Sequence, residues 1–226
     1  MKKIKTVCLI LCLCVCTSCL TVSYSAAGEW ADVATSKKIA LTFDDGPHPR
    51  YTDRILEILD EYGVTATFFI IGVNAENYPS SLKKIAKSGC EIANHSYSHV
   101  DMDKLSASEA ENEIKRCEDA IVSLVGVKPT LFRPPRGKVS KSLPDVASRL
   151  GYNVVLWSID TLDWSLLPSD KICSTVMNNV HGGDIILMHD YVSGGNTTCD
   201  ALRQFIPLLL SEGYEFVTVS DLLSQR

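Results

Sequence analysis

The chain has 226 residues, of which 46% are hydrophobic, and its formal net charge is -5. This length is enough for one domain with a full hydrophobic core. The acidic balance gives no basic footprint of the kind that nucleic-acid-binding proteins carry. We therefore expect no nucleic-acid partner, and we expect a monomer.

The N-terminal segment has the pattern of a secretory signal. Three lysines within the first five residues precede an apolar run over residues 7–16, and small side chains follow up to Ala27. This order is typical of a signal peptide, and the run is short for a membrane span, so an uncleaved anchor is less favoured. We expect a signal peptide over 1–27, a linker over 28–37 and one domain over 38–226. The protein would then be secreted or associated with the cell envelope, with no membrane span after cleavage.

The nine cysteines fall into two groups. Five lie at or before Cys19, which could instead be a lipid attachment site, although Cys16 stands where such a signal usually has leucine. The other four show no CxxC pair, so a structural zinc knuckle is not expected. In an exported protein they could form disulfides, and free buried thiols are equally compatible with the pattern. They are Cys90, Cys117, Cys173 and Cys199.

A helix followed by a glycine recurs along the chain. Apolar side chains on one face predict a helix over residues 52–62, and Ser106 with Glu109 forms a capping-box pattern at the start of another. The glycine after a helix supplies the left-handed residue that ends it. The six predicted helices span residues 52–62, 81–88, 106–125, 140–150, 170–180 and 200–212.

Short β-type runs alternate with these helices. Such alternation predicts parallel strands joined by helical crossovers. Runs that are apolar on both faces, such as residues 66–71, suit strands that are covered on both sides. A barrel and a doubly wound sheet both fit, and seven strands favour an α/β fold with a distorted (β/α)7-type barrel. The seven predicted strands span residues 39–43, 65–71, 90–94, 130–133, 154–157, 185–188 and 215–219.

Polar residues of the kind found in active sites follow several of these strands directly. In parallel α/β folds the carboxyl ends of the strands share one edge, where sites are built. Segments that are far apart in the sequence are therefore expected to meet there. The residues concerned are Asp44, Asp45, His95, His99, Arg133, Asp160, Asp163, Trp164 and His189.

The motif HSYSH suggests a metal site. On a helical turn, His95 and His99 would face the same side and could grip one ion. An isolated pair of this spacing is more often an ordinary surface pair, but this one shares its edge with Asp44 and Asp45. Two histidines and one carboxylate form a standard ligand set with open positions. One aspartate could instead cap the following turn, although not both, because adjacent side chains leave a strand end in opposite directions.

Other residues at this edge have both a functional and an ordinary interpretation. Arg133 could be the counter-charge of the free aspartate or a simple salt-bridge partner. The prolines up to Pro135 and then Gly137 make a rigid turn that could aim a backbone N–H at a substrate oxygen. Trp164 could be a sugar platform or part of the core. His189 is a candidate proton donor or a hydrogen-bonded residue at a strand end.

The motifs TFDDG, HSYSH, RPPRG, DTLDW and LMH resemble, in this order, the five motifs of the polysaccharide deacetylases, the carbohydrate esterase family 4 or NodB homology group. The resemblance covers roughly residues 38–220. It implies a distorted barrel with a groove across its edge and the metal-dependent removal of N-acetyl groups from a glycan built on N-acetylglucosamine. It implies a glycan partner, and we expect peptidoglycan.

The resemblance also implies roles for individual residues. Zinc is the typical metal, with cobalt or another divalent ion as alternatives, and it would polarise the amide carbonyl and activate a water molecule. Asp44 would be the general base, oriented by Arg133. Asp163 would support His189 as the general acid. The implied metal ligands are Asp45, His95 and His99.

One residue departs from the family pattern. The third motif usually reads RPPYG, and this chain has Arg136 in place of the tyrosine. The implied oxyanion donor is the backbone N–H of this residue, which arginine retains, so we expect activity to survive. The added positive charge would suit acidic glycans such as peptidoglycan with its peptide carboxylates. The implied substrate-binding residues are Pro135, Arg136, Trp164 and Leu187, the last two lining a pocket for the acetyl methyl group.

Three alternatives remain. The substrate could be chitin oligomers, xylan or a secreted exopolysaccharide. The chain could be a non-catalytic glycan-binding relative, although it keeps Asp44, Asp45, His95, His99 and His189 together. A two-histidine, one-carboxylate iron oxygenase fits poorly, because such enzymes usually have an antiparallel β-helix fold and not this alternation of helix and strand.

Overall fold

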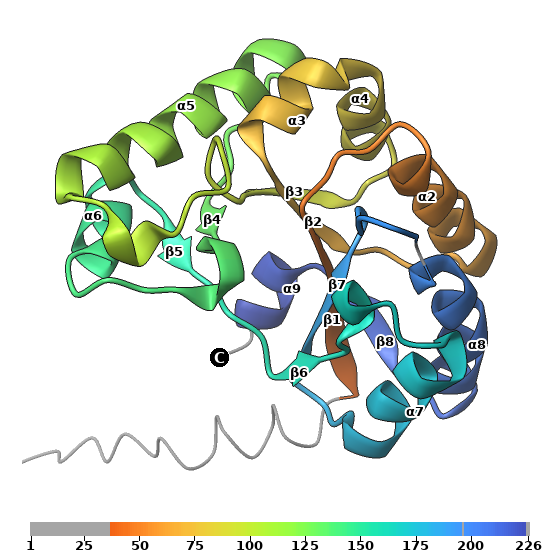
Figure 1. The fold of residues 1–226 in the computed structure, drawn as a ribbon. Helices are drawn as coiled ribbons and strands as arrows, with labels where there is room; N and C mark the ends of the chain where they lie inside the picture. Colours follow the sequence, from red (N-terminus) through yellow and green to blue (C-terminus); the bar gives the residue numbers. More distant parts are fainter. Residues whose placement is uncertain (1–36, 196, 225–226) are drawn as a thin grey trace, which may run out of the picture.

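Eight parallel strands form one curled sheet in the computed structural model, which describes residues 37–195 and 197–224 (Figure 1). The expected signal peptide and all of the expected linker except Lys37 lie outside the described residues. The strands are β1 (Lys38–Asp44), β2 (Thr67–Ile70), β3 (Glu91–Asn94), β4 (Leu131–Phe132), β5 (Asn153–Val154), β6 (Ile159–Asp160), β7 (Ile185–His189) and β8 (Glu215–Val217).

The strand order confirms the predicted α/β fold and distorted barrel of parallel strands. The order is β5-β4-β3-β2-β1-β7-β6, and β8 also pairs with β1. One half of β1, Lys38–Ala40, pairs with β8, while Thr42–Asp44 pairs with β2. Within the described residues β5 and β6 end the order without pairing with each other, so the barrel is open along that side.

With the exception of α9, the helices lie around the outside of the curled sheet (Figure 1). All six predicted helices are present, with ends shifted by up to three residues. The capping box at the start of α5 is formed, because Ser106 and Glu109 satisfy each other's backbone N–H. Short 3-10 helices span Met102–Lys104, Pro135–Gly137 and Asp163–Ser165. The helices are α2 (Tyr51–Tyr62), α3 (Gly72–Asn77), α4 (Pro79–Lys87), α5 (Ala107–Val125), α6 (Leu143–Arg149), α7 (Ser169–Asn179), α8 (Thr198–Ser211) and α9 (Val219–Leu223).

The alternation of side chains along β1 divides the core into two layers. Ile39, Leu41 and Phe43 are fully buried in the outer layer, against the helices. Ala40 belongs to a smaller inner cluster inside the barrel. Because successive side chains point to opposite faces of a strand, Asp44 also faces inward, at the carboxyl end of β1. The inner face is therefore apolar at one end and polar at the other.

The predicted strand over residues 215–219 is shorter than expected because a helix begins within it. The Thr218 side chain accepts a hydrogen bond from the Asp221 N–H and caps α9. Val219 and Leu222 pack in the inner cluster, and the Val219 N–H donates to Thr67 Oγ1 at the start of β2 (2.9 Å). The helix α9 therefore fills the barrel interior at the end opposite the strand carboxyl ends.

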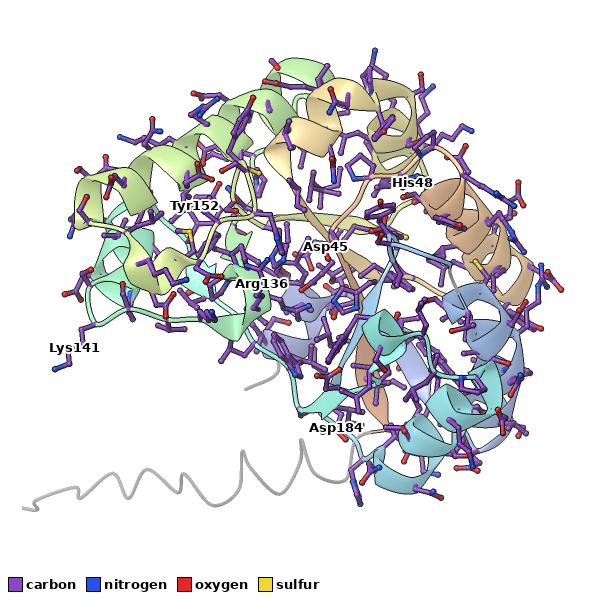
Figure 2. All side chains as sticks on the ribbon, viewed as in Figure 1. Asp45, His48, Arg136, Lys141, Tyr152 and Asp184 are labelled. Carbon is purple, nitrogen blue, oxygen red and sulfur yellow. The ribbon has the colours of Figure 1, made fainter. Side chains whose placement is uncertain are left out.

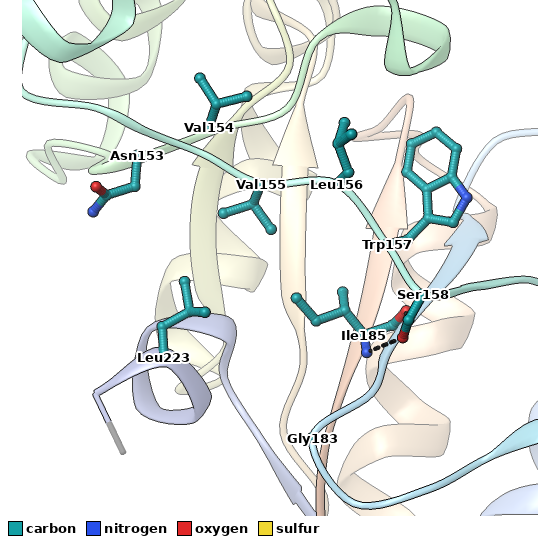
Figure 3. A pocket seen from close by; sticks show the side chains of 9 residues that line it. All are labelled: Asn153, Val154, Val155, Leu156, Trp157, Ser158, Gly183, Ile185 and Leu223. Atoms are coloured by element: carbon teal, nitrogen blue, oxygen red, sulfur yellow. Dashed lines mark hydrogen bonds between the residues drawn. The ribbon is translucent and has the colours of Figure 1, made fainter. Parts of the chain in front are cut away.

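The predicted strand over residues 154–157 also stops early, at Val154. The next carbonyl oxygens, of Val155 and Leu156, accept hydrogen bonds from the Arg133 side chain (3.3 and 3.1 Å) instead of continuing a ladder. The chain then turns across the open side of the barrel into β6, which the sequence does not predict. This crossing lines a cavity of about 470 Å³ with Gly183, Ile185 and Leu223 (Figure 3).

The four described cysteines are free thiols, which decides between the two readings that the sequence left open. Cys117 and Cys199 are buried, and burial raises the pKa of both thiols. No helix within the described part of the chain is both long enough and apolar enough to cross a membrane.

We expect Leu222→Ala to lower the free energy of unfolding by about 2–5 kcal/mol, because Leu222 is 2% exposed and its loss leaves a cavity under α9. Denaturant unfolding measures this value. The matched control is Leu208→Ala on α8, where the side chain is 47% exposed, and it should change the value by about 0.5 kcal/mol or less. Equal effects of the two substitutions would contradict the conclusion that α9 packs into the barrel interior and stabilises it.

Candidate active site

The predicted site residues meet at the carboxyl ends of the strands, around one cavity of about 500 Å³. Arg133 and Asp163 lie behind its wall and are almost fully buried. Pro135 is also buried and is not among the lining residues. Trp164 is 53% exposed, which excludes its interpretation as a core residue. The lining residues are Asp44, Asp45, His95, His99, Arg136, Trp157, Asp160, Trp164, Leu187 and His189.

A buried ion pair joins Arg133 to Asp44. Arg133 Nη1 donates to Asp44 Oδ1 (2.7 Å) and to Thr42 Oγ1 (2.8 Å), and the guanidinium lies 3.9 Å from the centre of the Phe69 ring. Burial lowers the pKa of Arg133, and the negative charge of Asp44 opposes that effect. A buried charge is tolerated when it is paired and its donors are satisfied, and both conditions hold here.

Both adjacent aspartates line the same cavity, against the expectation that their side chains leave the strand in opposite directions. The reason is the backbone of Asp45, which is left-handed with φ 77°. Such a conformation costs roughly 1–2 kcal/mol for a residue with a side chain. A residue of a neighbouring helix stabilises this conformation, because Asn74 Nδ2 in α3 donates a hydrogen bond to the Asp45 carbonyl oxygen (2.8 Å).

The expectation of a helical turn over residues 95–99 is wrong. The segment is a bent loop in which Ser96 (φ 67°) and His99 (φ 58°) are left-handed. Two side-chain hydrogen bonds hold this shape: Asn94 Oδ1 accepts from the Ser96 N–H, and Ser96 Oγ accepts from the His99 N–H. Local bonds of this kind compete with helix formation, and here they bring both imidazoles to one point.

Glu113 also supports this loop, and the sequence analysis did not identify it. It projects from α5 and accepts hydrogen bonds from the N–H groups of Tyr97 and Ser98 (3.1 and 2.8 Å) and from the Ser98 hydroxyl. A signal for it exists in the sequence. Glu113 interrupts the apolar stripe of α5 between Ala110 and Ile114, where a charge needs a partner.

Asp45, His95 and His99 fit a metal ion. The Nε2 atoms of His95 and His99 lie 3.4 and 3.1 Å from Asp45 Oδ1, and this buried oxygen has no hydrogen-bond partner. His95 Nδ1 lies 2.7 Å from the carbonyl oxygen of Arg133. Because a carbonyl only accepts, Nδ1 carries the proton and Nε2 turns its lone pair toward the carboxylate.

The lone pair of His95 Nε2 and the carboxylate oxygen of Asp45 repel each other unless a cation lies between them. The ligand atoms of Asp45, His95 and His99 all lie within 4.8 Å of one another, which leaves room for one such ion.

His189 is oriented by Asp163. Its Nδ1 donates to Asp163 Oδ1 (2.8 Å), and its backbone N–H donates to Asp163 Oδ2 (2.8 Å). The Thr198 hydroxyl also donates to Oδ2 (2.7 Å), a contact that the sequence analysis missed. Burial lowers the pKa of His189, but Asp163, with smaller contributions from Asp44 and Asp45, raises it to about 9. His189 is therefore protonated at neutral pH.

Gly46 lies directly against Asp190. A Cβ atom at Gly46 would be 2.0 Å from Asp190 Oδ2, an oxygen that also accepts a hydrogen bond from Thr52. Asp190 is fully buried, its other oxygen has no partner, and burial raises its pKa to about 7. Position 46, the glycine of the TFDDG motif, therefore has no room for a side chain. Gly137 of RPPRG is similarly close to Trp157, whose ring would be 2.9 Å from an added Cβ.

Residues 31–155 match the sequence model of a family described as polysaccharide deacetylase. A peptidoglycan-N-acetylglucosamine deacetylase of Bacillus cereus is 39% identical over 199 residues, which cover 87% of this chain and 93% of that protein. The peptidoglycan-N-acetylmuramic acid deacetylase PdaC of Bacillus subtilis is 41% identical over 186 residues, which cover 82% of this chain and 38% of that protein.

A solved structure shares the fold. The crystal structure of the Bc1960 peptidoglycan N-acetylglucosamine deacetylase superposes with a TM-score of 0.80 and 37% sequence identity. The superposition covers 84% of this chain and 89% of that one. The curled sheet and its surrounding helices are therefore shared with a deacetylase of known structure.

We expect Gly46→Ala to lower the free energy of unfolding by about 1–3 kcal/mol, because the added methyl group displaces the Asp190 carboxylate. The double substitution Gly46→Ala with Asp190→Ala provides the control. If the close contact is the cause, the loss in the double variant is smaller than the sum of the two single losses. Additive losses in the free energy of unfolding, measured with denaturant, would show that the contact with Asp190 is not what excludes a side chain at position 46.

Proposed function

The chain belongs to the polysaccharide deacetylase family, hydrolases that act on amide bonds, and from this premise we propose that it removes N-acetyl groups from N-acetylglucosamine residues of peptidoglycan. The observation that carries the proposal is the convergence of one metal-type ligand set, one free carboxylate and one protonated histidine on a single cavity. The relatives named above support the substrate, because their names refer to peptidoglycan.

Asp45, His95 and His99 would hold the metal, with zinc as our proposal, since two imidazoles and one carboxylate suit that ion and leave positions open. The bound ion would polarise the acetamide carbonyl and make water a stronger nucleophile. Arg133 contributes indirectly, because its carbonyl oxygen fixes the tautomer of His95.

Asp44 would be the general base. Arg133 holds one of its oxygens, while the other, Oδ2, lies 3.7 Å from His95 Nε2, beside the ligand set. An ionised carboxylate with one oxygen turned to the cavity can take the proton of the attacking water as the new C–O bond forms. General-base catalysis of this kind contributes about 10²–10⁴-fold.

The wall of the cavity would bind the acetyl group and the negative charge that develops on its oxygen. Among residues 37–195 and 197–224, no backbone or side-chain acceptor receives a hydrogen bond from the backbone N–H of Arg136, so this donor could stabilise the oxyanion. Leu187 and Trp164 line the same cavity and would contact the methyl group. This small apolar surface favours acetyl over larger acyl groups.

His189 would be the general acid. Its Nδ1 is held by Asp163, so the Nε2–H is the proton it can release. Asp44 and His189 occupy matched positions on the neighbouring strands β1 and β7, so their side chains share one face of the sheet, which supports their assignment as base and acid of one reaction. As the C–N bond breaks, His189 protonates the sugar nitrogen, and acetate and a free amine leave.

A peptidoglycan substrate requires an extracytoplasmic location, for which the N-terminal signal pattern provides the route. The expected signal lies outside the described residues, so its cleavage remains part of the proposal. Chitin oligomers, xylan and exopolysaccharide remain the alternative substrates. A non-catalytic binding role is the alternative to enzyme activity, and acetate release distinguishes between the two.

The proposed activity predicts acetate release from peptidoglycan that a chelator abolishes and added zinc restores. Asp44→Asn should keep the metal but lose about 10²–10⁴-fold in turnover, because the amide cannot take the proton. His95→Ala should lose both metal and turnover. The control is His181→Ala, an exposed histidine that precedes β7, which should keep both. Full activity of Asp44→Asn, with metal content measured by elemental analysis, would rule out Asp44 as the base.

The proposed acid predicts an alkaline limb in the pH profile of kcat. His189 donates only when protonated, so the rate falls as the pH rises above its pKa. Asp163→Asn removes the charge that raises this pKa and should move the limb to lower pH, whereas structural damage would lower the rate at every pH. Asp184→Asn, a carboxylate change at the other end of β7 (Figure 2), should leave the limb in place. An unshifted limb in Asp163→Asn would contradict the assignment.

A further inference from the structure

A second cavity, of about 430 Å³, adjoins the candidate active site. Arg136 lines both cavities, and Figure 2 shows it on the side of the site that faces α6. The second cavity differs in character from the first, because its polar lining is mostly cationic. Its lining residues are Val100, Asp101, Lys104, Leu105, Arg136 and Lys138.

The carboxylate of Asp101 forms ion pairs with all three cationic side chains that line this second cavity. Asp101 Oδ1 accepts from Arg136 Nη1 (2.5 Å), and Oδ2 accepts from Lys104 Nζ (2.7 Å) and Lys138 Nζ (2.9 Å). The Asp101 side chain is only 16% exposed, whereas that of Lys104 is 72% exposed. The hydrogen bonds of Lys104 and Lys138 hold the pKa of Asp101 well below its usual range, so this carboxylate is ionised.

The cluster of Asp101, Lys104, Arg136 and Lys138 has a net positive charge, although the protein as a whole is acidic. Three cations face one carboxylate, and the nearby Asp103 adds only one more negative charge, while the chain as a whole carries -5. An ammonium has three donors and a guanidinium has five. Asp101 engages one donor of each side chain, so most donors remain available to a ligand.

The geometry also reduces the entropic cost of binding. Long cationic side chains lose rotamer freedom when they are fixed on a ligand, but Asp101 already restrains all three. The backbone of Arg136 is left-handed (φ 57°, ψ 18°) within a short 3-10 helix, which fixes where its side chain begins. A glycan that places an acetamide in the first cavity would bring substituents of a neighbouring sugar to the second.

From this arrangement we propose that Arg136, Lys104 and Lys138 form a subsite for a carboxylate carried by the sugar next to the one that is deacetylated. The inference rests on the proposed function and specifies its substrate as an anionic glycan. In peptidoglycan such a carboxylate has two sources, the free lactyl group of a muramic acid without peptide and the carboxylates of an attached peptide.

The test compares kcat/KM for acetate release from three substrates: a neutral chitin oligomer, peptide-free glycan strands with lactyl carboxylates, and strands with attached peptides. The variant is Lys104→Gln with Lys138→Gln, which removes two cations and leaves Arg136 paired with Asp101. Its preference for an anionic over the neutral substrate should fall about five- to tenfold relative to wild type. A loss confined to one anionic substrate identifies the source of the carboxylate.

The matched control is Lys141→Gln. Lys141 is exposed, lies at the edge of the molecule (Figure 2) and lines neither cavity, so this variant should keep the wild-type preference. Raised ionic strength should reduce the preference in wild type and in the control, and less in the double variant, because only the former two retain the full set of charges.

The outcomes separate the subsite from the reaction. A reduced preference in the double variant, with the control unchanged, supports the subsite. Turnover of all three substrates with the same preference in the double variant as in Lys141→Gln would overturn the subsite and leave the proposed function standing. No acetate from any of the three substrates with metal-loaded wild type would overturn the proposed function and the subsite with it.

Discussion

The buried pair of Arg133 and Asp44 is the interaction on which the rest of this site depends. Through the same side chain, Arg133 ties the end of β4 to β1 and to the two carbonyl groups that follow β5. Through its own carbonyl oxygen it fixes the ring of His95. Removing one partner of a buried ion pair typically costs about 3–5 kcal/mol, because the other charge is left uncompensated. The residue that ties β4 to β1 and to the segment after β5 therefore also orients Asp44 and His95, so its contributions to stability and to the geometry of the site cannot be varied independently.

The two adjacent carboxylates have different neighbours, which suits them to the two different roles proposed for them. Asp44 faces a guanidinium inside the barrel, while Asp45 faces two imidazoles at its edge. The left-handed turn at Asp45 makes this possible, because an extended residue would have placed its side chain on the other face of the sheet. Backbone strain of this kind persists where the surroundings determine the conformation, and α3 together with the loop that follows β3 provides those surroundings.

Periodicity and glycine positions in the sequence predict seven of the eight described strands, six of the eight described helices and the edge where the polar residues meet, because these features depend on local patterns. They do not predict β6, whose two residues form a strand only by pairing with β7. They also miss the short helices α3 and α9. In α9, Thr218 has the residue type of a strand, and only the structure reveals that its side chain caps a helix. Glu113 and Thr198 are not predicted for a related reason: each forms hydrogen bonds with residues that are distant in the sequence. The motif resemblance identifies the residues of the site. It does not predict the left-handed backbone conformation that orients Asp45 and His99, because neither residue type is specific for that conformation.

The open side of the barrel has a consequence for solubility. A sheet that does not close exposes two edge strands, and long exposed edges invite another chain to add a strand. Here the order ends in β5 and β6, each only two residues long, which is too short to template an intermolecular ladder. The fold can thus leave this side of the sheet unpaired without the risk of amyloid-like stacking that an open barrel would otherwise carry.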